Sequence, residues 1–349
     1  MTGPGPSDER DTGARIRAFA PADAGAVLRL WETSIGARYP LREDVLESSL
    51  VADPTTTVRA AVAEVDHRVA GFAFAGACSG EQPELEGVRD RAWLQAVVVS
   101  PDQRRRGLGR ALVRRVLEVG RIVAATEVQT GGGLHYLWPG VPDDLDDAGP
   151  FLTSLGFTFD PHVSYDLRGD ISDVRVDATT ERVLAAGGSM VVPATPSDRE
   201  ALLAFILAEF GPEWWHDTRY FLDGGGSPAE ELLLVDAGRT IRGFARIHLP
   251  ASRPPGWPMF WRGAAPGTGG LGPIGVAEAL RGRGLGRALL VSALDRLRTL
   301  GSTDIVIDDT TLLGYYGPHG FSPWITYRHA VAPIGSFDAD VGAPIREDA

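Results

Sequence analysis

Two segments of the sequence repeat one pattern of arginine and glycine that suits the binding of a phosphate group. Residues 104–112 and 281–289 both read Arg-x-x-Gly-Leu-Gly-Arg-Ala-Leu. Each segment follows an apolar run that predicts a β-strand and opens an amphipathic stretch that predicts a helix. A strand, a glycine turn and a helix start present free backbone N–H groups to an anion. The two turns are separated by about the length of one domain, so the sequence predicts two copies of one phosphate-binding fold.

Glycine and arginine have separate roles in this interpretation. A glycine has no Cβ, so the backbone can approach a pyrophosphate closely, and an arginine adds charge-assisted hydrogen bonds. The positive end of the helix dipole, at Leu285 in the second copy, also favours an anion. The candidate phosphate-binding residues are Arg104, Arg105, Arg106, Gly107 and Gly109 in the first copy and Arg281, Gly282, Arg283, Gly284, Gly286 and Arg287 in the second. The alternative for any single arginine is a solvated position at a helix start.

The composition argues against several classes of protein. The chain of 349 residues has a formal net charge of −12 and is 44% hydrophobic. The charge argues against a binder of duplex nucleic acid and weakly favours a cationic substrate such as an amine. Residues 1–14 lack the apolar core of a signal peptide, and no apolar stretch approaches the ~18 residues of a membrane span. We expect a cytoplasmic protein with a small-molecule partner and without nucleic-acid, membrane or metal partners; its oligomeric state stays open.

The order of the predicted elements repeats in the two halves. The first half contains predicted strands at 15–19, 57–65, 68–77, 93–100, 122–129 and 163–167, and predicted helices at 22–35, 108–120 and 143–155. The second contains strands at 190–194, 231–236, 240–248, 271–276, 304–308 and 325–331, and helices at 198–210, 285–300 and 312–316. We therefore predict a tail over 1–14, domains over 15–170 and 189–333, a linker over 171–188 and a tail over 334–349.

This succession of elements resembles the GNAT acetyltransferase superfamily. The resemblance rests on the two Arg-x-x-Gly-x-Gly turns and on the two later helices that end in Gly156-Phe157 and Gly320-Phe321. The resemblance covers nearly all of residues 15–333. The arrangement of two such units is similar to that of tandem members of the mycothiol-synthase type. It implies an α+β protein of two tandem folds, each with a mixed, mostly antiparallel central sheet flanked by helices. It also implies acetyl-CoA as the cosubstrate.

The resemblance gives the strand before each turn a role as well. In this superfamily the pantetheine arm of acetyl-CoA pairs with the backbone of that strand, and a splay between it and the next strand admits the thioester. Val97 and Val99 would supply these backbone groups in the first copy, and Ile274 and Val276 in the second. Gly272-Pro273 predicts a β-bulge beside the second splay.

The second copy carries the tyrosine that the resemblance implies as general acid. Counting back from Gly320-Phe321, Tyr316 falls at that position, with Tyr315 as the alternative acid. Attack of an amine on a thioester expels a thiolate, which a nearby phenol can protonate. Asp309 falls at the position of the superfamily's asparagine, and the sequence contains no Asn. The alternative is that both tyrosines only pack in the core.

The first copy differs at the same positions. Counting back from Gly156-Phe157 gives Leu152 at the tyrosine position, and leucine cannot donate a proton. His135 or Tyr136 could act instead, although a structural loop over 134–142 fits this Pro/Gly-containing segment better. We therefore expect the first half either to bind acetyl-CoA without transferring its acetyl group or to serve as a scaffold.

The general base is less defined than the acid. Residues 271–276 contain no carboxylate, so the candidates are Asp308, Asp309, Glu213, His216 and a relay through water. Trp214 and Trp215 either contact the acceptor or pack in the core. The resulting hypothesis is acetyl transfer to a primary amine by direct attack in a ternary complex, with the C-terminal half active. The alternatives are acetylation of a cysteinyl pseudodisaccharide and a non-catalytic acyl-CoA-binding module.

Overall fold

The computed structural model describes residues 14–134, 136–254, 256, 267–337 and 346–347. Within these residues the two halves share one sheet of 14 strands, whose order is β14-β1-β2-β3-β4-β5-β13-β7-β12-β11-β10-β9-β8, with β6 paired to β13. The strands of the first half are β1 (Ala14–Ala18), β2 (Thr56–Val65), β3 (Arg68–Cys78), β4 (Arg91–Val99), β5 (Glu127–Thr130), β6 (Val141–Pro142) and β7 (Thr158–Asp170). Those of the second are β8 (Ser189–Pro193), β9 (Glu231–Asp236), β10 (Ile241–His248), β11 (Thr268–Val276), β12 (Asp304–Thr310), β13 (Ser322–Pro333) and β14 (Arg346–Glu347).

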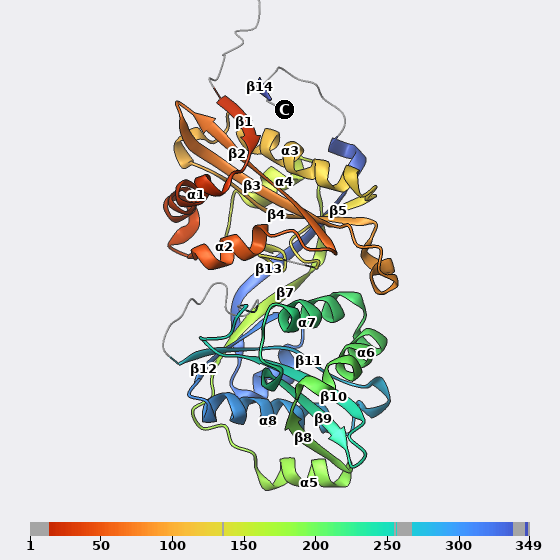
Figure 1. The fold of residues 1–349 in the computed structure, drawn as a ribbon. Helices are drawn as coiled ribbons and strands as arrows, with labels where there is room; N and C mark the ends of the chain where they lie inside the picture. Colours follow the sequence, from red (N-terminus) through yellow and green to blue (C-terminus); the bar gives the residue numbers. More distant parts are fainter. Residues whose placement is uncertain (1–13, 135, 255, 257–266, 338–345, 348–349) are drawn as a thin grey trace, which may run out of the picture.

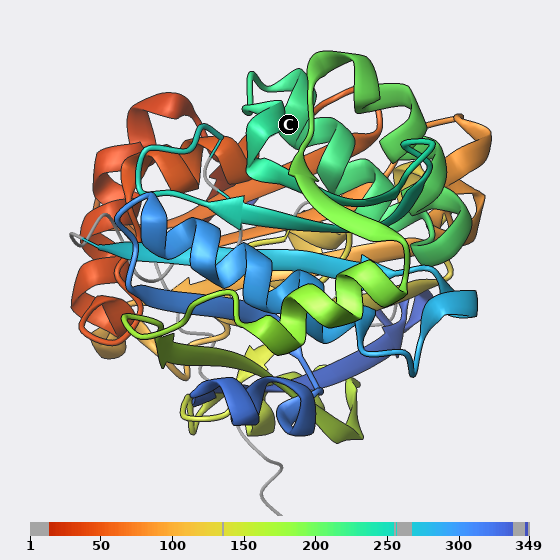
Figure 2. The same ribbon diagram turned by 90° about the horizontal axis from the view of Figure 1, so that it is seen from below.

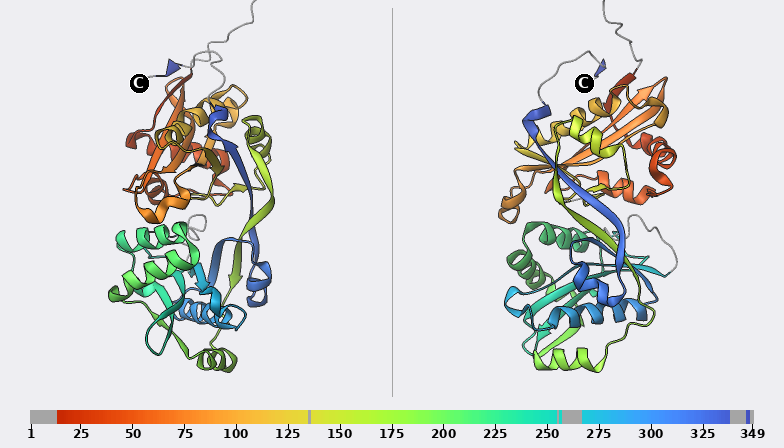
Figure 3. Two further views of the ribbon diagram at one scale, coloured as in Figure 1. Left: turned by 90° about the vertical axis from the view of Figure 1, so that its right-hand side faces the viewer. Right: turned by 180° about the vertical axis from the view of Figure 1, so that it is seen from behind.

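The halves exchange their last long strands, β7 and β13. The end of β7 pairs with β12 of the second half, where Asp170 lies opposite Asp304. The end of β13 pairs with β5 of the first half, where Val331 lies opposite Gln129. Figures 1 and 3 show both strands running from one half into the other. The exchange leaves no sheet edge between the halves, because backbone groups that an edge would expose are paired across the junction.

Helices cover both faces of the sheet in each half. The first half contains α1 (Ala24–Trp31), α2 (Glu43–Leu50), α3 (Leu108–Ile122) and α4 (Ala148–Ser154), and the second contains α5 (Ala178–Ala186), α6 (Arg199–Phe210), α7 (Pro212–Asp223), α8 (Leu285–Thr299) and α9 (Leu313–Tyr316). In the first half α1 and α2 pack into one core, and α3 and α4 into another. In the second half α5 and α8 lie together on one face, whereas α6 and α7 lie on the other (Figure 2).

One core cluster belongs to both halves. Leu85 and Trp93 of the first half pack with Leu203, Trp215 and Phe244 of the second. Removing this apolar surface from water holds the halves together, at roughly 25 cal/mol per Å² buried. None of the helices in the described part of the chain combines the length and apolar character that crossing a bilayer requires.

Sequence periodicity located the long helices well and the short elements poorly. The predicted apolar stripe of α8, which contains Leu290 and Leu294, is fully buried. The segment 171–188, predicted as a linker, contains α5, which packs against α8. The helix predicted over 143–155 begins only at Ala148, since residues 141–142 form β6 against β13. Helix α7 was missed, because Gly211 ends α6 at a φ of 89° and Pro212 opens a new helix.

Candidate active site

The two glycine turns adopt nearly the same backbone conformation. The glycine that opens each helix is left-handed, with a φ of 86° at Gly107 and 80° at Gly284. Two residues earlier, φ is 63° at Arg105 and 76° at Gly282. Among the described residues, none accepts a hydrogen bond from the backbone amides of 105–110 or 282–287. Both turns therefore present free N–H groups at a helix start, which fits the pyrophosphate of a CoA ester.

The arginines of the first turn are engaged within the protein. Arg104 lies 3.2 Å from the carboxylate of Asp147, and Arg106 donates to the Gln103 side chain at 2.5 Å. Arg110 donates to the carbonyl of Ser154.

The corresponding arginines of the second turn are more available. Arg281, Arg283 and Arg287 are exposed, and none of them forms a hydrogen bond or ion pair with another described residue. The second turn thus has more cationic groups free to meet phosphate.

Both halves contain a splay between the strand before the turn and its parallel neighbour. The ladder between β4 and β5 ends at Leu94 and Thr130, and that between β11 and β12 ends at Gly270 and Val306. Each strand bulges just beyond this point. The register shifts at Gln95 in β4 and at Gly272-Pro273 in β11, where the bulge had been predicted. The backbone of the predicted pantetheine-binding residues follows these bulges: Val97 and Val99 in β4, Ile274 and Val276 in β11.

Asp308 faces the splay of the second half. Its Oδ1 lies 3.0 Å from the place that a Cβ on Gly272 would occupy, so the carboxylate stands directly across the splay. Its Oδ2 accepts a hydrogen bond from the Tyr136 hydroxyl at 2.5 Å. Burial raises the pKa of Asp308 to about 7, the Tyr136 hydrogen bond opposes this rise, and the charges of Asp309 and Asp217 add to it. A carboxylate with a pKa near neutrality suits a general base.

A second buried carboxylate supports this part of β12. Asp166 of β7 accepts hydrogen bonds from the Tyr327 hydroxyl at 2.7 Å and from the backbone amide of Asp309 at 3.2 Å. Burial, followed by the charge of Asp308, raises the pKa of Asp166 well above its ordinary range. Asp309 itself is exposed and has a φ of 41°. At the position predicted for the family's asparagine, the backbone amide of Asp309 therefore takes part in the hydrogen bonds of Asp166, whereas its side chain does not.

The two candidate acid tyrosines have different surroundings. Tyr315 donates its hydroxyl to the carbonyl of Gly286 at 2.8 Å, so it is engaged at the turn. Tyr316 is 4% exposed, and no described residue hydrogen-bonds its hydroxyl. Burial raises the pKa of the Tyr316 phenol, and the charges of Tyr315 and Asp308 act in the same direction. The phenol therefore keeps its proton at neutral pH, as an acid must.

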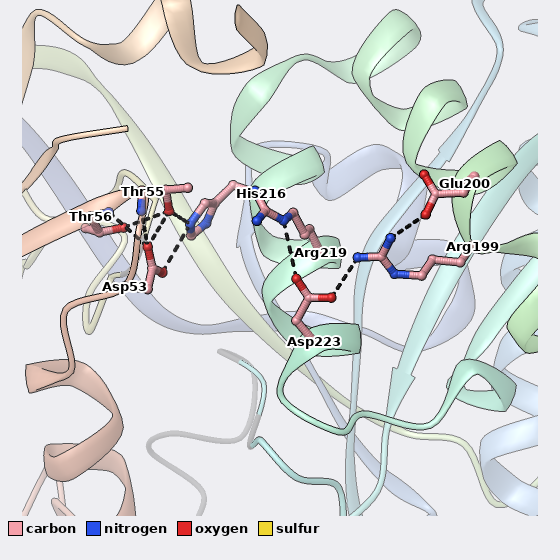
Figure 4. Close-up of polar contacts among 8 residues, drawn as sticks. All are labelled: Asp53, Thr55, Thr56, Arg199, Glu200, His216, Arg219 and Asp223. Carbon is pink, nitrogen blue, oxygen red and sulfur yellow. Dashed lines mark hydrogen bonds and ion pairs between the residues drawn. The ribbon is translucent and has the colours of Figure 1, made fainter. Parts of the chain in front are cut away.

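The other candidate bases lie in different settings. His216 contacts the first half, with Nε2 2.6 Å from the hydroxyl of Thr55 and 3.5 Å from the carboxylate of Asp53 (Figure 4). On the same helix, Arg219 pairs with Asp223, which also binds Arg199 of α6 (Figure 4). The structure thus gives His216 a role in joining the halves.

Glu213, Trp214 and Trp215 lie in the first turn of α7. Burial raises the pKa of Glu213, opposed by the charge of Arg91. Trp214 is half-buried and stacks on Phe210, whose ring lies against Gly275 of β11. Trp215 is buried in the core shared by the halves. Trp214 is therefore the one of the pair that lies beside the strand of the splay.

The splay of the first half is spanned by its own loop. Gln95 donates to the carbonyl of Gly132 at 2.9 Å and accepts from the backbone amide of Leu137 at 2.9 Å. Trp138 from the same loop stacks on Trp31. His135 lies outside the described residues, so its predicted role is not addressed by the structure. Leu152 is buried in the core.

The comparison with known families agrees with this geometry. The acetyltransferase (GNAT) family matches residues 27–131 and 200–321. These ranges make up more than half of the chain, and the protein therefore belongs to the GNAT acetyltransferases. The predicted family and the predicted α+β tandem architecture are confirmed. Members of this family generally use acetyl-CoA.

One curated relative and two solved structures define the similarity further. A region of 157 residues is 31% identical to the mycothiol acetyltransferase of Pseudarthrobacter chlorophenolicus, covering 41% of this chain and 45% of the relative. The chain thus spans about half the length of that protein. The fold is similar to the GCN5-related glucosamine N-acetyltransferase region of a fungal multi-domain GH3 β-N-acetylglucosaminidase, with a TM-score of 0.82 and 22% identity over 95% of this chain and 39% of that one. It is also similar to a tandem GNAT protein from the clavulanic acid biosynthesis pathway, with a TM-score of 0.63 and 19% identity over 92% of this chain and 99% of that one.

Proposed function

We propose that the protein transfers the acetyl group of acetyl-CoA to a primary amine of a small molecule, and that the C-terminal half carries the active site. The observation that supports this most is the placement of Asp308 directly across the splay from Gly272. A titratable carboxylate with a pKa of about 7 there can accept a proton from the attacking amine. In the first half Gly131 takes the place of Asp308, and a glycine has no side chain that could accept a proton.

The residues of the second half would have four roles in the proposed reaction. The turn over 281–287 would bind the pyrophosphate through backbone amides and through arginines without a described protein partner. The backbone of Ile274 and Val276 would orient the pantetheine arm. Bound acetyl-CoA supplies the thioester. Asp308 would accept the proton of the amine, and Tyr316 would donate a proton to the departing sulfur.

Calorimetry and a thiol-release assay test the proposal together. The wild-type protein should bind acetyl-CoA, and a panel of primary amines that includes glucosamine should contain an acceptor that releases free thiol from it. Asp308→Asn should bind acetyl-CoA as the wild type does and release thiol far more slowly. A protein that does not bind acetyl-CoA would overturn the assignment. Binding without thiol release across the panel would favour the non-catalytic acyl-CoA-binding module.

A second candidate acceptor comes from the curated relative. Its name, mycothiol acetyltransferase, describes a protein to which 157 residues of this chain are 31% identical. A cysteinyl pseudodisaccharide therefore belongs in the amine panel. Preference for it over glucosamine in kcat/KM would assign the narrower activity.

A further inference from the structure

We propose that Tyr136 of the N-terminal half is a positioning residue of the C-terminal active site, where its hydroxyl orients the carboxylate of the base Asp308. The inference rests on the proposed function, in which Asp308 accepts the proton of the amine. The first half would then contribute to the reaction through Tyr136, and not through its own turn and splay.

The two oxygens of Asp308 face different partners. Oδ2 accepts the hydroxyl of Tyr136 at 2.5 Å, a short charge-assisted hydrogen bond. Oδ1 is the atom that points at Gly272 and therefore at the splay. Fixing Oδ2 leaves the carboxylate little freedom to rotate. The free oxygen is thus held where an amine attacking the thioester would release its proton.

Several hydrogen bonds within the first half hold the loop that contains Tyr136. Gln95 binds the loop on both sides of the tyrosine, through the carbonyl of Gly132 and the amide of Leu137. The amide of Gly132 also donates to the carbonyl of Trp138 at 2.7 Å. Tyr136 is 8% exposed, so its position is set by protein contacts. The splay of the first half has in effect become the support of this loop.

The hydrogen bond from Tyr136 acts against the charges that surround Asp308. Burial and neighbouring carboxylates raise the pKa of Asp308, whereas the Tyr136 donor lowers it. Without the donor, the carboxylate would hold its proton to a higher pH and could not serve as a base near neutrality. The groups that act on Asp308 from the elements packed around it are Asp309 of β12, Asp217 of α7, Asp166 of β7, Tyr316 of α9, Tyr327 of β13 and Tyr136 itself.

Tyr136→Phe removes this hydroxyl and keeps the ring. The limb of kcat/KM that falls toward low pH, measured by thiol release with glucosamine as acceptor, should move upward by about one to two pH units, the equivalent of a hydrogen bond to a charged group. Activity should therefore drop several-fold or more at pH 6 and recover at high pH. A merely structural role would lower activity at every pH alike.

Tyr39→Phe is the matched control. Tyr39 is another buried tyrosine of the first half that donates to a carboxylate at 2.5 Å, but its partner is Asp144 and not Asp308. We expect its pH profile to match that of the wild type. Gln95→Gly, which keeps the phenol but releases its loop, should shift the limb in the same direction as Tyr136→Phe by a smaller amount.

A titration that does not depend on activity separates this inference from the proposed function. The side-chain carboxyl carbon of Asp308, assigned with Asp308→Asn, can be followed by NMR in ¹³C-aspartate-labelled protein. A higher pKa of Asp308 in Tyr136→Phe than in wild type and Tyr39→Phe would support the inference. An unchanged pKa would overturn it. A raised pKa with an unchanged rate profile would support the contact with Tyr136 and overturn the role of Asp308 as base.

Discussion

The two halves of the molecule carry the same turn on the same fold and differ in the side chains around the splay. The turns agree within about 15° in φ at both left-handed positions, with values of 63° and 86° in one and 76° and 80° in the other. The splays are lined differently. Counted from the turns, the ladders and the Gly-Phe segments, the corresponding residues are Gln95 and Gly272, Gly131 and Asp308, Phe151 and Tyr315, and Leu152 and Tyr316.

This difference shows which part of the site the repeated fold preserves. An anion site made of backbone amides needs only the glycine turn and the helix start, so both copies retain its geometry. Acid–base chemistry needs particular side chains, and the proposed acid and base both belong to the second half. In the first half Gln95 uses the same place in the splay to hold a loop, and that loop carries Tyr136 to the other site. We therefore expect one productive site per chain.

The largest expected effect comes from placing one carboxylate in either turn. Gly284→Asp should abolish both acetyl-CoA binding to the second half and thiol release, because a negative charge would face the pyrophosphate. Gly107→Asp should spare most thiol release. The two variants are well matched, since both glycines are left-handed and the backbone cost of a side chain there is roughly 1–2 kcal/mol. Calorimetry and thiol release measure the outcome, with circular dichroism to confirm folding. Loss of activity only in Gly107→Asp would show that the first half is the catalytic one.

The next effect distinguishes the two tyrosines from their counterparts in the first half. Tyr316→Phe should lower kcat by roughly 10²–10⁴, the usual contribution of general acid catalysis, with nearly unchanged acetyl-CoA affinity. Tyr315→Phe should instead weaken acetyl-CoA binding, because it loses the hydrogen bond to Gly286. A normal kcat for Tyr316→Phe at saturating substrates would move the acid role to Tyr315 or to water.

Asp308→Asn should separate catalysis from stability. Since the folded protein raises the pKa of Asp308 to about 7, whereas an unfolded aspartate titrates near 3.9, ionising it in the folded state costs stability. The cost is absent below about pH 4, grows between the two pKa values and is complete above about pH 7. Between pH 5 and pH 8 the wild type should therefore lose roughly 2–3 kcal/mol in the free energy of unfolding relative to Asp308→Asn, which has no such titration.

The same variant should be a poor enzyme. We expect it to lose about 10²-fold in kcat/KM at pH 8 and to lack the fall in rate below pH 7 that we expect of the wild type. Denaturant titrations and rate profiles at the two pH values measure both effects. A variant that is less stable than the wild type at pH 8 would show that Asp308 is stabilised by its surroundings rather than strained by them.

The sequence predicted the backbone part of the site better than its side-chain part. The turn, the bulge at Gly272-Pro273 and the long helix after the turn follow from local patterns of glycine, proline and apolar residues. The exchange of β7 and β13 does not, because the residues of a strand do not indicate which half supplies its neighbours. A choice between partners is made by tertiary packing, which has no local signal.

The candidate base illustrates the same limit within the site. Asp308 is one of four candidate bases in the sequence, and nothing local distinguishes it from Asp309, its neighbour. What distinguishes them in the structure is their depth, and the contact of Asp308 with a tyrosine far away in the chain. The sequence suggests Tyr136 only as an acid of the first half. A long-range hydrogen bond between halves leaves no spacing in the sequence from which it could be found.

The smallest expected effect tests whether the first splay is an idle site or a support. Gln95→Gly gives the first half the residue that the second has at Gly272, and it removes two buried hydrogen bonds to the loop. The free energy of unfolding should fall by about 1–3 kcal/mol, measured in denaturant. Opening this splay should confer no second site, because Leu152 and Gly131, the counterparts of Tyr316 and Asp308, supply neither an acid nor a base. In the double variant with Gly284→Asp, thiol release should therefore stay absent. Thiol release that reappears in this double variant would mean that the first half was kept inactive only by its loop, and that the halves differ in access rather than in chemistry.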